Sequence, residues 1–476
     1  MMNEPRRLHP VAALLRFLRS LRELAVPLLI FVFIGGGNDG RFFSLLYIMG
    51  IMLLIVGFLV YGILSWYLYT YRIEDGELRI EHGVLVRKKR YIPVERIQTI
   101  DISAGIIQRL FGLVKVQVET AGGGNEAEAV LSAITATEAE QLRSMLLSEK
   151  KENIDKEEEH SEVFTLLPKD LFIMASTSGG IGVVFSAVFA FITQFDELLP
   201  DDYLLSVTEE VIKSGVVFVT FSGFLVLILA WIISVISTAI KYGKYTLIKK
   251  GNELLITRGL LEKRELTIPL HRVQAVRIQE NIIRQLFGFA SVYIEVAGGA
   301  MEKSEEYSTF LLPIVKKSEI KNHLLLFTPE FFSKDEQFQP LPIRARKRFL
   351  FRTTFPSIVA AALISWFFPP WGYISIVLIP LALLLGNRMF RESGWLLMQN
   401  RLSLRFRFIN RHTVLAKKNR IQSFNLVHSF FQRKNRLTSI VISVQSKMAG
   451  KHFKVVDVDE DDGYELFKWY SYEKFE

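Results

Sequence analysis

The sequence of 476 residues contains no cysteine. Disulfide bonds, thiolate metal sites and cysteine nucleophiles are therefore excluded. The eight histidines show neither an HExxH motif nor another ligand spacing, so nothing supports a metal centre or a hydrolytic site. A P-loop needs Gly-Lys followed by Ser or Thr, and neither glycine-rich stretch, at residues 121–124 and 297–299, has it. We expect no enzyme activity, no cofactor and no metal.

Charged side chains are also absent from three long apolar runs. A helix rises about 1.5 Å per residue, so a run longer than about 18 residues can span a bilayer core of about 30 Å. The three runs are Phe42–Leu68, Leu171–Phe195 and Ser214–Ile240. We therefore expect an integral membrane protein.

Two further apolar regions are less regular. Leu24–Gly37 is short and contains Pro27, while Thr353–Asn387 is uncharged but is interrupted by a Pro-Pro-Trp-Gly turn signal at residues 369–372. Two short helices or a re-entrant hairpin fit the second region. With both regions counted, the sequence predicts about six transmembrane helices in three pairs.

The net charge of +9 is unevenly distributed along the chain. Basic residues gather before the first and fifth predicted spans and after the sixth, whereas the connection between the third and fourth spans, residues 196–210, is acidic. Lys and Arg mark the cytoplasmic side of a membrane. The sequence therefore predicts a cytoplasmic N-terminus and C-terminus. No recognition motif accompanies the basic charge, so we expect no nucleic-acid binding.

An internal repeat organises the rest of the chain. Tyr69–Gly122 returns 176 positions later as Tyr245–Gly298, and a weaker third copy begins near Trp395. Matching positions include Leu110-Phe111-Gly112 and Leu286-Phe287-Gly288. Similarity this dense reports duplicated structural units. Each unit follows one pair of predicted spans, so all three units are expected in the cytoplasm.

The first copy predicts a small antiparallel β domain that ends in a helix. Residues 77–81 and 114–118 alternate polar and apolar side chains, as half-buried strands do. Residues 106–111 form a short apolar helix pattern, closed by Gly112, where a left-handed cap is easily adopted. Thr137 and Glu140 match a capping box before the final helix. The fold class is thus a multi-domain α+β membrane protein.

One short motif recurs in all three copies. It reads Arg-Ile-Gln at Arg96–Gln98, Arg-Val-Gln at Arg272–Gln274 and Arg-Ile-Gln at Arg420–Gln422. Together with the preceding Gly-hydrophobic strand pairs, it resembles the bacterial pleckstrin-homology-like (PH-like) membrane domain. The resemblance covers essentially the full chain. The third copy departs from it, with Lys417 in place of Pro93 and Pro269, and with Arg433–Arg436 where Leu-Phe-Gly stands in the other copies.

The resemblance implies a multi-pass plasma-membrane protein with three PH-like β modules on the cytoplasmic face. It also implies the lipid bilayer and a smaller membrane protein with one PH-like domain as partners, and relatives are associated with protection against, or export of, membrane-active bacteriocins. The predicted organisation is as follows: transmembrane pairs at 8–68, 171–240 and 353–387, PH-like domains at 69–150, 241–327 and 388–476, and linkers at 151–170 and 328–352.

Two sets of residues are candidate contacts. The recurring Arg96, Gln98, Arg272, Gln274, Arg420 and Gln422 could bind a lipid phosphate, because guanidinium is a bidentate donor, or could satisfy backbone carbonyls where strand and helix meet. The basic tip, Arg87, Lys88, Lys89 and Arg90, could meet anionic headgroups or could be a solvated turn. Its counterpart in the second copy, residues 262–265, is neutral overall, which argues against a shared lipid site.

Two functions remain open. The first is a non-enzymatic membrane scaffold that presents its modules to a partner, by exposed strand edges or by the Leu-Phe-Gly helix face. The second is a component of an exporter for peptides or lipid-like molecules. The three uncharged runs lack the intramembrane charge that usually marks ion-coupled transport.

Overall fold

The computed structural model describes residues 4–35, 41–120, 128–148, 162–177, 186, 215–297, 309–332, 337–446 and 450–471. The glycine-rich residues 121–124 and 298–299, the charged run 149–160, the acidic connection 196–210 and most of the third predicted span lie outside these residues. The chain forms two compact units. One contains residues 1–160 with 261–269 and 298–303, and the other contains 161–260, 270–297 and 304–476.

The first unit holds two antiparallel sheets. One has the order β1-β2-β3-β4, from β1 (Arg6–Arg7), β2 (Thr70–Glu74), β3 (Glu77–His82) and β4 (Lys88–Pro93). The other contains β7 (Ala129–Thr135), β6 (Leu113–Thr120), β5 (Ile97–Ala104) and β11 (Lys263–Pro269), in that order. Alternating apolar side chains of both sheets, among them Leu78, Ile100 and Val118, form one buried core.

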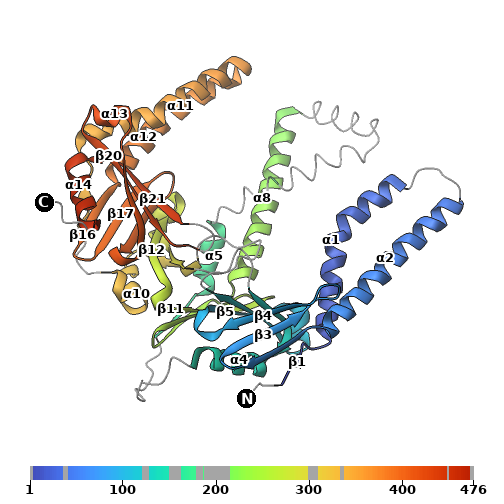
Figure 1. The fold of residues 1–476 in the computed structure, drawn as a ribbon. Helices are drawn as coiled ribbons and strands as arrows, with labels where there is room; N and C mark the ends of the chain where they lie inside the picture. Colours follow the sequence, from blue (N-terminus) through green and yellow to red (C-terminus); the bar gives the residue numbers. More distant parts are fainter. Residues whose placement is uncertain are drawn as a thin grey trace. The chain divides into compact units, whose positions relative to one another are not determined.

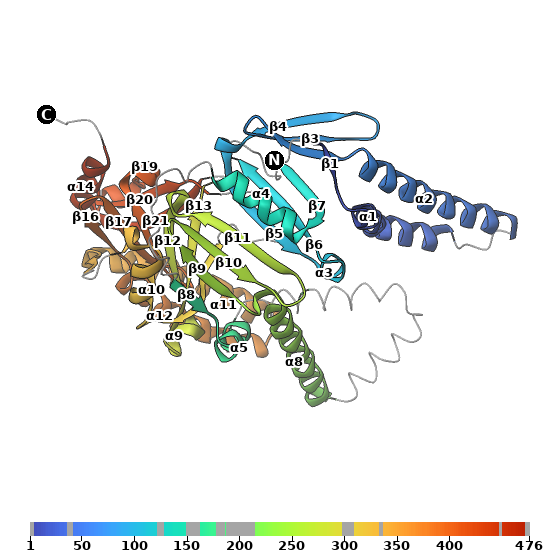
Figure 2. The ribbon, with the colours of Figure 1, turned by 90° about the horizontal axis from the view of Figure 1, so that it is seen from below.

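Four helices complete the first unit: α1 (Val11–Gly35), α2 (Arg41–Tyr67), α3 (Ile106–Leu110) and α4 (Ala136–Ser148). Helix α4 contacts strands β5, β6 and β7, as Figure 2 shows. Its capping box uses Thr135 and Glu138 rather than Thr137 and Glu140. The Thr135 hydroxyl oxygen accepts from the Glu138 amide, and the Glu138 carboxylate accepts from the Thr135 amide, each at 3.2 Å. The helix starts earlier than predicted, because β7 ends directly at its cap.

The second unit contains three sheets. The first holds β8 (Glu162–Thr165), β9 (Thr246–Lys250) and β10 (Glu253–Arg258). The next is seven-stranded, in the order β14 (Thr309–Lys316), β13 (Phe289–Val296), β12 (Val273–Glu280), β18 (Arg411–Lys417), β17 (Arg401–Arg407), β16 (Gly394–Met398) and β15 (Gln339–Pro340). The last consists of β19 (Ile421–Val427), β20 (Leu437–Val444) and β21 (Lys451–Asp459).

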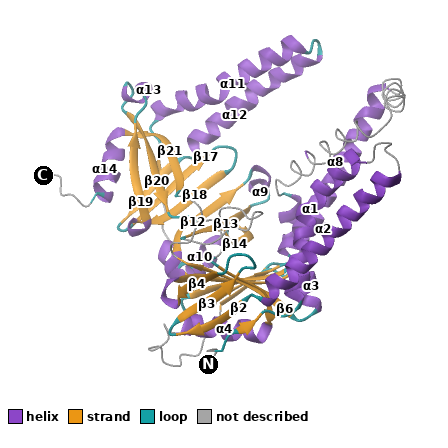
Figure 3. Ribbon diagram, turned by 45° about the vertical axis from the view of Figure 1, so that its right-hand side comes forward, coloured by secondary structure: helices purple, strands orange, loops and turns teal. Residues whose placement is uncertain are grey.

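The helices of the second unit are α5 (Pro168–Ser176), α8 (Gly215–Tyr242), α9 (Ile282–Leu286), α10 (Ile320–Phe327), α11 (Arg346–Phe367), α12 (Leu378–Arg391), α13 (Phe430–Arg433) and α14 (Glu460–Tyr470). Helices α11 and α12 pack side by side as a hairpin, and α14 lies against the β19–β21 sheet (Figures 1 and 3). The Pro-Pro-Trp-Gly signal thus marks the turn of a helical hairpin.

Membrane-spanning helices are fewer than the six predicted. Within the described residues, three helices are long and apolar enough to cross a membrane: Gly223–Tyr242, Ile343–Phe367 and Trp371–Arg391, and Met52–Tyr67 is a shorter apolar helix. The first predicted span differs for a physical reason. Helix α1 carries Arg16, Arg19 and Arg22 in its N-terminal half, so only its second half is free of charge.

A short strand precedes each membrane-helix pair and pairs with the first strand after it. The three pairs of strands are β1 with β2, β8 with β9, and β15 with β16. Strands β8 and β15 lie in segments that the sequence analysis assigned to linkers. Backbone hydrogen bonds of these strands thus hold together the chain before and after each helical segment.

Candidate interaction surfaces

The recurring Arg-x-Gln residues occupy equivalent places in the three copies. Arg96, Arg272 and Arg420 each end a short 3₁₀ helix, directly before β5, β12 and β19. Arg96 is exposed, and the other two are half-buried. Burial, and next the neighbouring Arg420, lower the pKa of Arg272.

The three glutamines differ from copy to copy. Gln274 is buried, and its side-chain amide donates to the Arg272 carbonyl oxygen at 2.9 Å. Gln422 is exposed, and of Gln98 only the backbone, in β5, is described. In the second copy the motif therefore satisfies its own loop, which is one of the two roles predicted for it.

The basic tip is exposed and specific to the first copy. Arg87 precedes β4, while Lys88, Lys89 and Arg90 lie in it. Glu81 on β3 forms ion pairs with Arg87 at 2.8 Å and with Lys89 at 3.5 Å. Ion pairs this exposed contribute little to stability. The tip is thus an exposed sheet edge with a single acidic neighbour among the partners shown.

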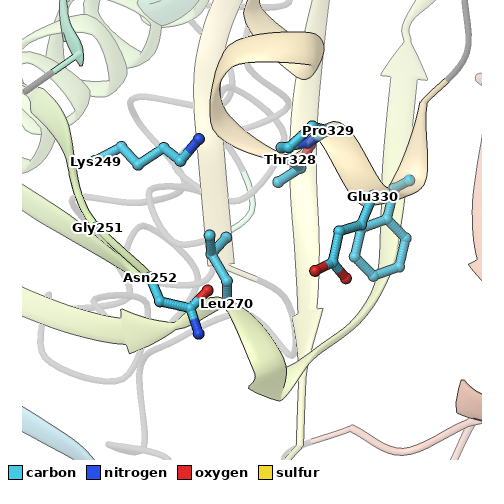
Figure 4. Close-up of a pocket in the computed structure, with 8 residues that line it drawn as sticks. Lys249, Gly251, Asn252, Leu270, Thr328, Pro329 and Glu330 are labelled. Atoms are coloured by element: carbon cyan, nitrogen blue, oxygen red, sulfur yellow. The ribbon is translucent and has the colours of Figure 1, made fainter. Parts of the chain in front are cut away.

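A small cavity lies beside the β9–β10 turn in the second unit (Figure 4). Its volume is about 210 Å³, below the roughly 300 to 1,000 Å³ usual for small-molecule sites. Lys249 donates to the Leu326 carbonyl oxygen at 2.6 Å, and Glu330 pairs with Lys417. Both charges at the cavity are therefore engaged, and we assign it no ligand. The lining residues are Lys249, Gly251, Asn252, Leu270, Thr328, Pro329, Glu330 and Phe331.

Exposed apolar tips recur in every copy. One tip is the short helix after β5, β12 or β19, and the other is the turn after β3, β10 or β17. Leu286 and Phe287, for example, are 75% and 66% exposed. Large apolar side chains grouped on a surface mark a site of contact with protein or membrane. The helix-tip residues are Leu110, Phe111, Leu286, Phe287, Phe430 and Phe431, and the turn residues are Leu85, Val86, Leu260, Leu261, Phe408 and Ile409.

Buried polar contacts place one helix tip beside a membrane-helix base. Arg284 on α9 is 7% exposed and donates from Nε to the Thr177 hydroxyl at 2.9 Å and from Nη2 to the Met174 carbonyl at 3.1 Å. Asn281, the N-cap of α9, donates to the Thr177 carbonyl at 2.9 Å. Met174 and Thr177 lie at the end of α5, inside the third predicted span. The Leu286-Phe287 tip is thereby held next to the end of α5.

The third copy repeats this arrangement with other residues (Figure 3). Asp457 on β21 is fully buried and accepts from Arg348 Nε at 2.9 Å and Arg352 Nη2 at 2.8 Å, both on α11. Gln432 on α13 donates to the same carboxylate at 2.8 Å. A single carboxylate therefore joins the base of α11, the tip helix α13 and the last sheet.

The turn tips also lie beside membrane-helix ends. The Leu260 amide donates to the Ile240 carbonyl of α8 at 2.9 Å. Arg407, which precedes Phe408, pairs at 2.7 Å with Glu392, the residue that follows α12. In the second and third copies, the turn tips thus lie next to the ends of α8 and α12.

Two strand joints connect consecutive copies. Strand β5 of the first copy pairs with β11 of the second, and β12 of the second pairs with β18 of the third. Arg143 on α4 pairs with Glu265 of β11 at 2.6 Å, and Arg411 of β18 pairs with Glu280 of β12. Neither joint was predicted. In each joint, backbone hydrogen bonds pair a strand of one copy with a strand from the sequence of the next copy.

The second joint carries a buried electrostatic cluster. Glu295 is fully buried and accepts from Arg277 at 3.2 Å and Lys451 at 2.9 Å. Burial, then the charges of Arg277, Lys451 and Arg407, lower the pKa of His412 to about 4. His412 is therefore neutral at pH 7, and it stacks on Phe406.

The residues that tie modules to membrane helices were missed by sequence reasoning. Arg284 and Gln432 occupy the third position of α9 and α13, yet their types differ, and the equivalent Gln108 of α3 donates to the Ser132 carbonyl of β7 instead, so the repeat alone does not single them out. The one available signal is Asp457, an acidic residue between the apolar Val456 and Val458.

Comparison with known proteins gives the family. The family model described as "Bacterial PH domain" matches residues 24–150, 189–326 and 349–474. Over 494 aligned positions the chain is 41% identical to the UPF0699 transmembrane protein YdbT of Bacillus subtilis (strain 168), with 100% of this chain and 99% of YdbT covered. The predicted resemblance is confirmed. The chain therefore belongs to the bacterial PH domain family, as a transmembrane protein with three such domains and full-length similarity to YdbT.

Proposed function

We propose that this protein is a non-enzymatic scaffold that holds three bacterial PH domains against the cytoplasmic face of the cell membrane and recruits a smaller membrane protein with one such domain. The observation that carries the proposal is the pair of strand joints, β5 with β11 and β12 with β18. Sheets that continue from one copy to the next are suited to fixed presentation of surfaces rather than to independent ligand binding.

The apolar tips support placement at the bilayer surface. They lie at membrane-helix bases and expose large side chains such as Leu286 and Phe430. Apolar side chains that enter the interfacial region are stabilised by about 25 cal/mol for each Å² removed from water. In this arrangement the apolar tips contact the bilayer, and the strand edges remain available to bind proteins.

The test is purification of the full-length protein in mild detergent from its own cells. We expect a second membrane protein with one bacterial PH domain in stoichiometric amount. A solitary protein would refute the scaffold. Because the chain has no native thiol, single cysteines at Ser144 and Lys454 test topology, and labelling of either by an external maleimide would refute the cytoplasmic placement.

The physiological role that fits best is protection of the membrane against membrane-active peptides. The alternative function is that of an exporter component for such peptides or for lipid-like molecules. Reconstitution with a labelled antimicrobial peptide separates the two, because a scaffold leaves the peptide distribution unchanged, whereas an exporter moves it in one direction.

A further inference from the structure

Strand β19 stands out as the outer strand of the last sheet, whose order is β19-β20-β21. Its counterparts in the earlier copies are interior strands, since β11 covers β5 and β18 covers β12. Among the described residues, no strand pairs with the outer side of β19. An open edge of this kind is a template for strand addition.

The two existing joints use one register. The second copy follows the first by 176 positions, and the third follows the second by 148 positions. Ile100, Val276 and Phe424 therefore occupy equivalent positions in the three copies. Ile100 faces Thr267, and Val276 faces Leu415. Thr267 and Leu415 are themselves 148 positions apart. In both joints, equivalent positions of the incoming strand (β11 or β18) and of the receiving strand (β5 or β12) therefore face each other. The same register is expected for a strand that pairs with β19 at Phe424.

Side-chain exposure agrees with a missing strand at β19. Asn425 is exposed, whereas its counterpart Arg277 is 8% exposed within its joint. Val427 is likewise exposed. Residues 421–427 include no charged side chain, and proteins commonly protect an open edge with Lys or another charge. The edge of β19 is thus unprotected and suited to pairing.

The chain's own β4 is equivalent to β11 and β18 but is a poor match for this edge. In the fixed register Arg90 would face Asn425, where the existing joints place Leu266 or Val414. In the second joint, Glu280 forms an ion pair with Arg411. The equivalent residue of the third copy is His428, directly after β19. A strand carrying three basic residues would therefore find no acidic acceptor there, which argues against a second copy of this chain.

We propose that β19 accepts the edge strand of a bacterial PH domain in a second membrane protein, added antiparallel in the register of the two internal joints. The incoming strand is the one before that protein's Arg-x-Gln motif, and it carries an apolar residue opposite Asn425. This inference rests on the proposed function, since it names the surface on which the recruited partner binds.

The experiment places the photo-crosslinking residue p-benzoylphenylalanine at Val427 of the full-length protein in its own cells. The matched control carries the probe at Lys454, an exposed position on the other edge strand of the same sheet. We expect an adduct at least tenfold stronger from position 427, and mass spectrometry should place it on the strand before the partner's Arg-x-Gln motif. The exposed substitution Asn425→Lys should reduce that adduct at least tenfold without changing the melting temperature.

Five outcomes would overturn the inference. An adduct between two copies of this chain would make β19 a self-association edge, and an adduct with a protein lacking a bacterial PH domain would show a different partner. Equal adducts from positions 427 and 454 would show that the contact is not at the edge. A co-purifying partner without any adduct at 427 would leave the proposed function standing, whereas the absence of a partner would refute both.

Discussion

The substitution Asp457→Asn tests whether a buried carboxylate couples the third module to its membrane helices. Asparagine keeps the shape of aspartate and an acceptor oxygen for Gln432, and it tolerates the left-handed backbone at this residue, where φ is 59°. The substitution therefore removes the charge and little else. Two arginines lose their anionic partner, Arg348 with a side chain 21% exposed and Arg352 with one 43% exposed.

The expected magnitude follows from this partial burial. Removing one partner of a buried ion pair is destabilising by about 3 to 5 kcal/mol, and solvent access to the two arginines reduces the value here to about 2 to 4 kcal/mol. The matched control is Asp459→Asn on the same strand. Asp459 pairs with Arg344, whose side chain is 44% exposed, so its loss should amount to about 1 kcal/mol or less. Asparagine also retains the N-cap of α14.

The assay is pulse proteolysis in urea on the detergent-solubilised protein, with detection of a C-terminal tag. The unfolding equilibrium constants of the two variants should differ by about 30-fold, which corresponds to about 2 kcal/mol. In a double-mutant cycle, adding Arg348→Met to Asp457→Asn should be less damaging than the sum of the single effects. Equal stabilities for Asp457→Asn and Asp459→Asn would refute the coupling.

Three further predictions address other parts of the fold. Burial lowers the pKa of His412 in the folded protein to about 4, below its ordinary 6.5, so His412 should contribute stability that is present above pH 6.5 and falls by at most about 3 kcal/mol as the pH drops toward 4. Urea titrations of the wild type and of His412→Gln at several pH values measure this contribution. A stability difference between the two proteins that does not depend on pH would contradict the prediction. Arg436 holds φ 50° where Gly112 and Gly288 stand in the other copies, so Arg436→Gly should stabilise the module by about 0.5 to 1 kcal/mol, and a lower urea midpoint would be evidence against strain there. A fluorophore on Leu286→Cys in nanodiscs should be quenched by nitroxide lipids while one on Lys454→Cys is not, and equal quenching would disprove membrane contact by the tip.

Local features of the fold were predictable because they depend on nearby residues. Gly112 and Gly288 adopt φ values of 65° and 71° at the ends of the tip helices, as the predicted left-handed cap requires. Alternation in residues 77–81 and 114–118 gave strands β3 and β6. The repeat itself located three modules. In each case the pattern and its structural consequence lie within a few residues of each other.

The strand joints could not be predicted in the same way. An alternating pattern such as residues 263–269 shows which face of a strand is buried but does not identify its neighbour. Strand β11 therefore reads as part of the second copy, although it pairs with β5 of the first. The strands β1 and β15 have two residues each, too few for any periodicity. Pairing over long sequence separations is decided by tertiary packing.

For the candidate interaction residues, too, the sequence pattern alone does not give the role of each residue. Arg272 and Arg420 recur at a position where a 3₁₀ helix meets a strand in each copy, so their recurrence alone does not distinguish a structural role from a ligand contact. Asp457 has no acidic counterpart in the apolar second-copy strand, yet it links a tip helix, a sheet and a membrane helix. Residues that couple modules to the membrane are thus found where the copies differ.

The internal joints also explain why the two ends of the array should differ. In a series of modules linked by one type of strand pairing, the interior pairing edges are covered, whereas among the described residues no strand pairs with the first incoming edge, β4, or the last receiving edge, β19. Lys88, Lys89 and Arg90 protect β4 with charge, whereas residues 421–427 leave β19 uncharged. If both ends were uncharged, the array could extend with copies of itself into a filament, since head-to-tail contacts that do not close continue indefinitely. One protected and one open edge instead allow a single terminal module to be added, and for that reason a partner with one domain suffices.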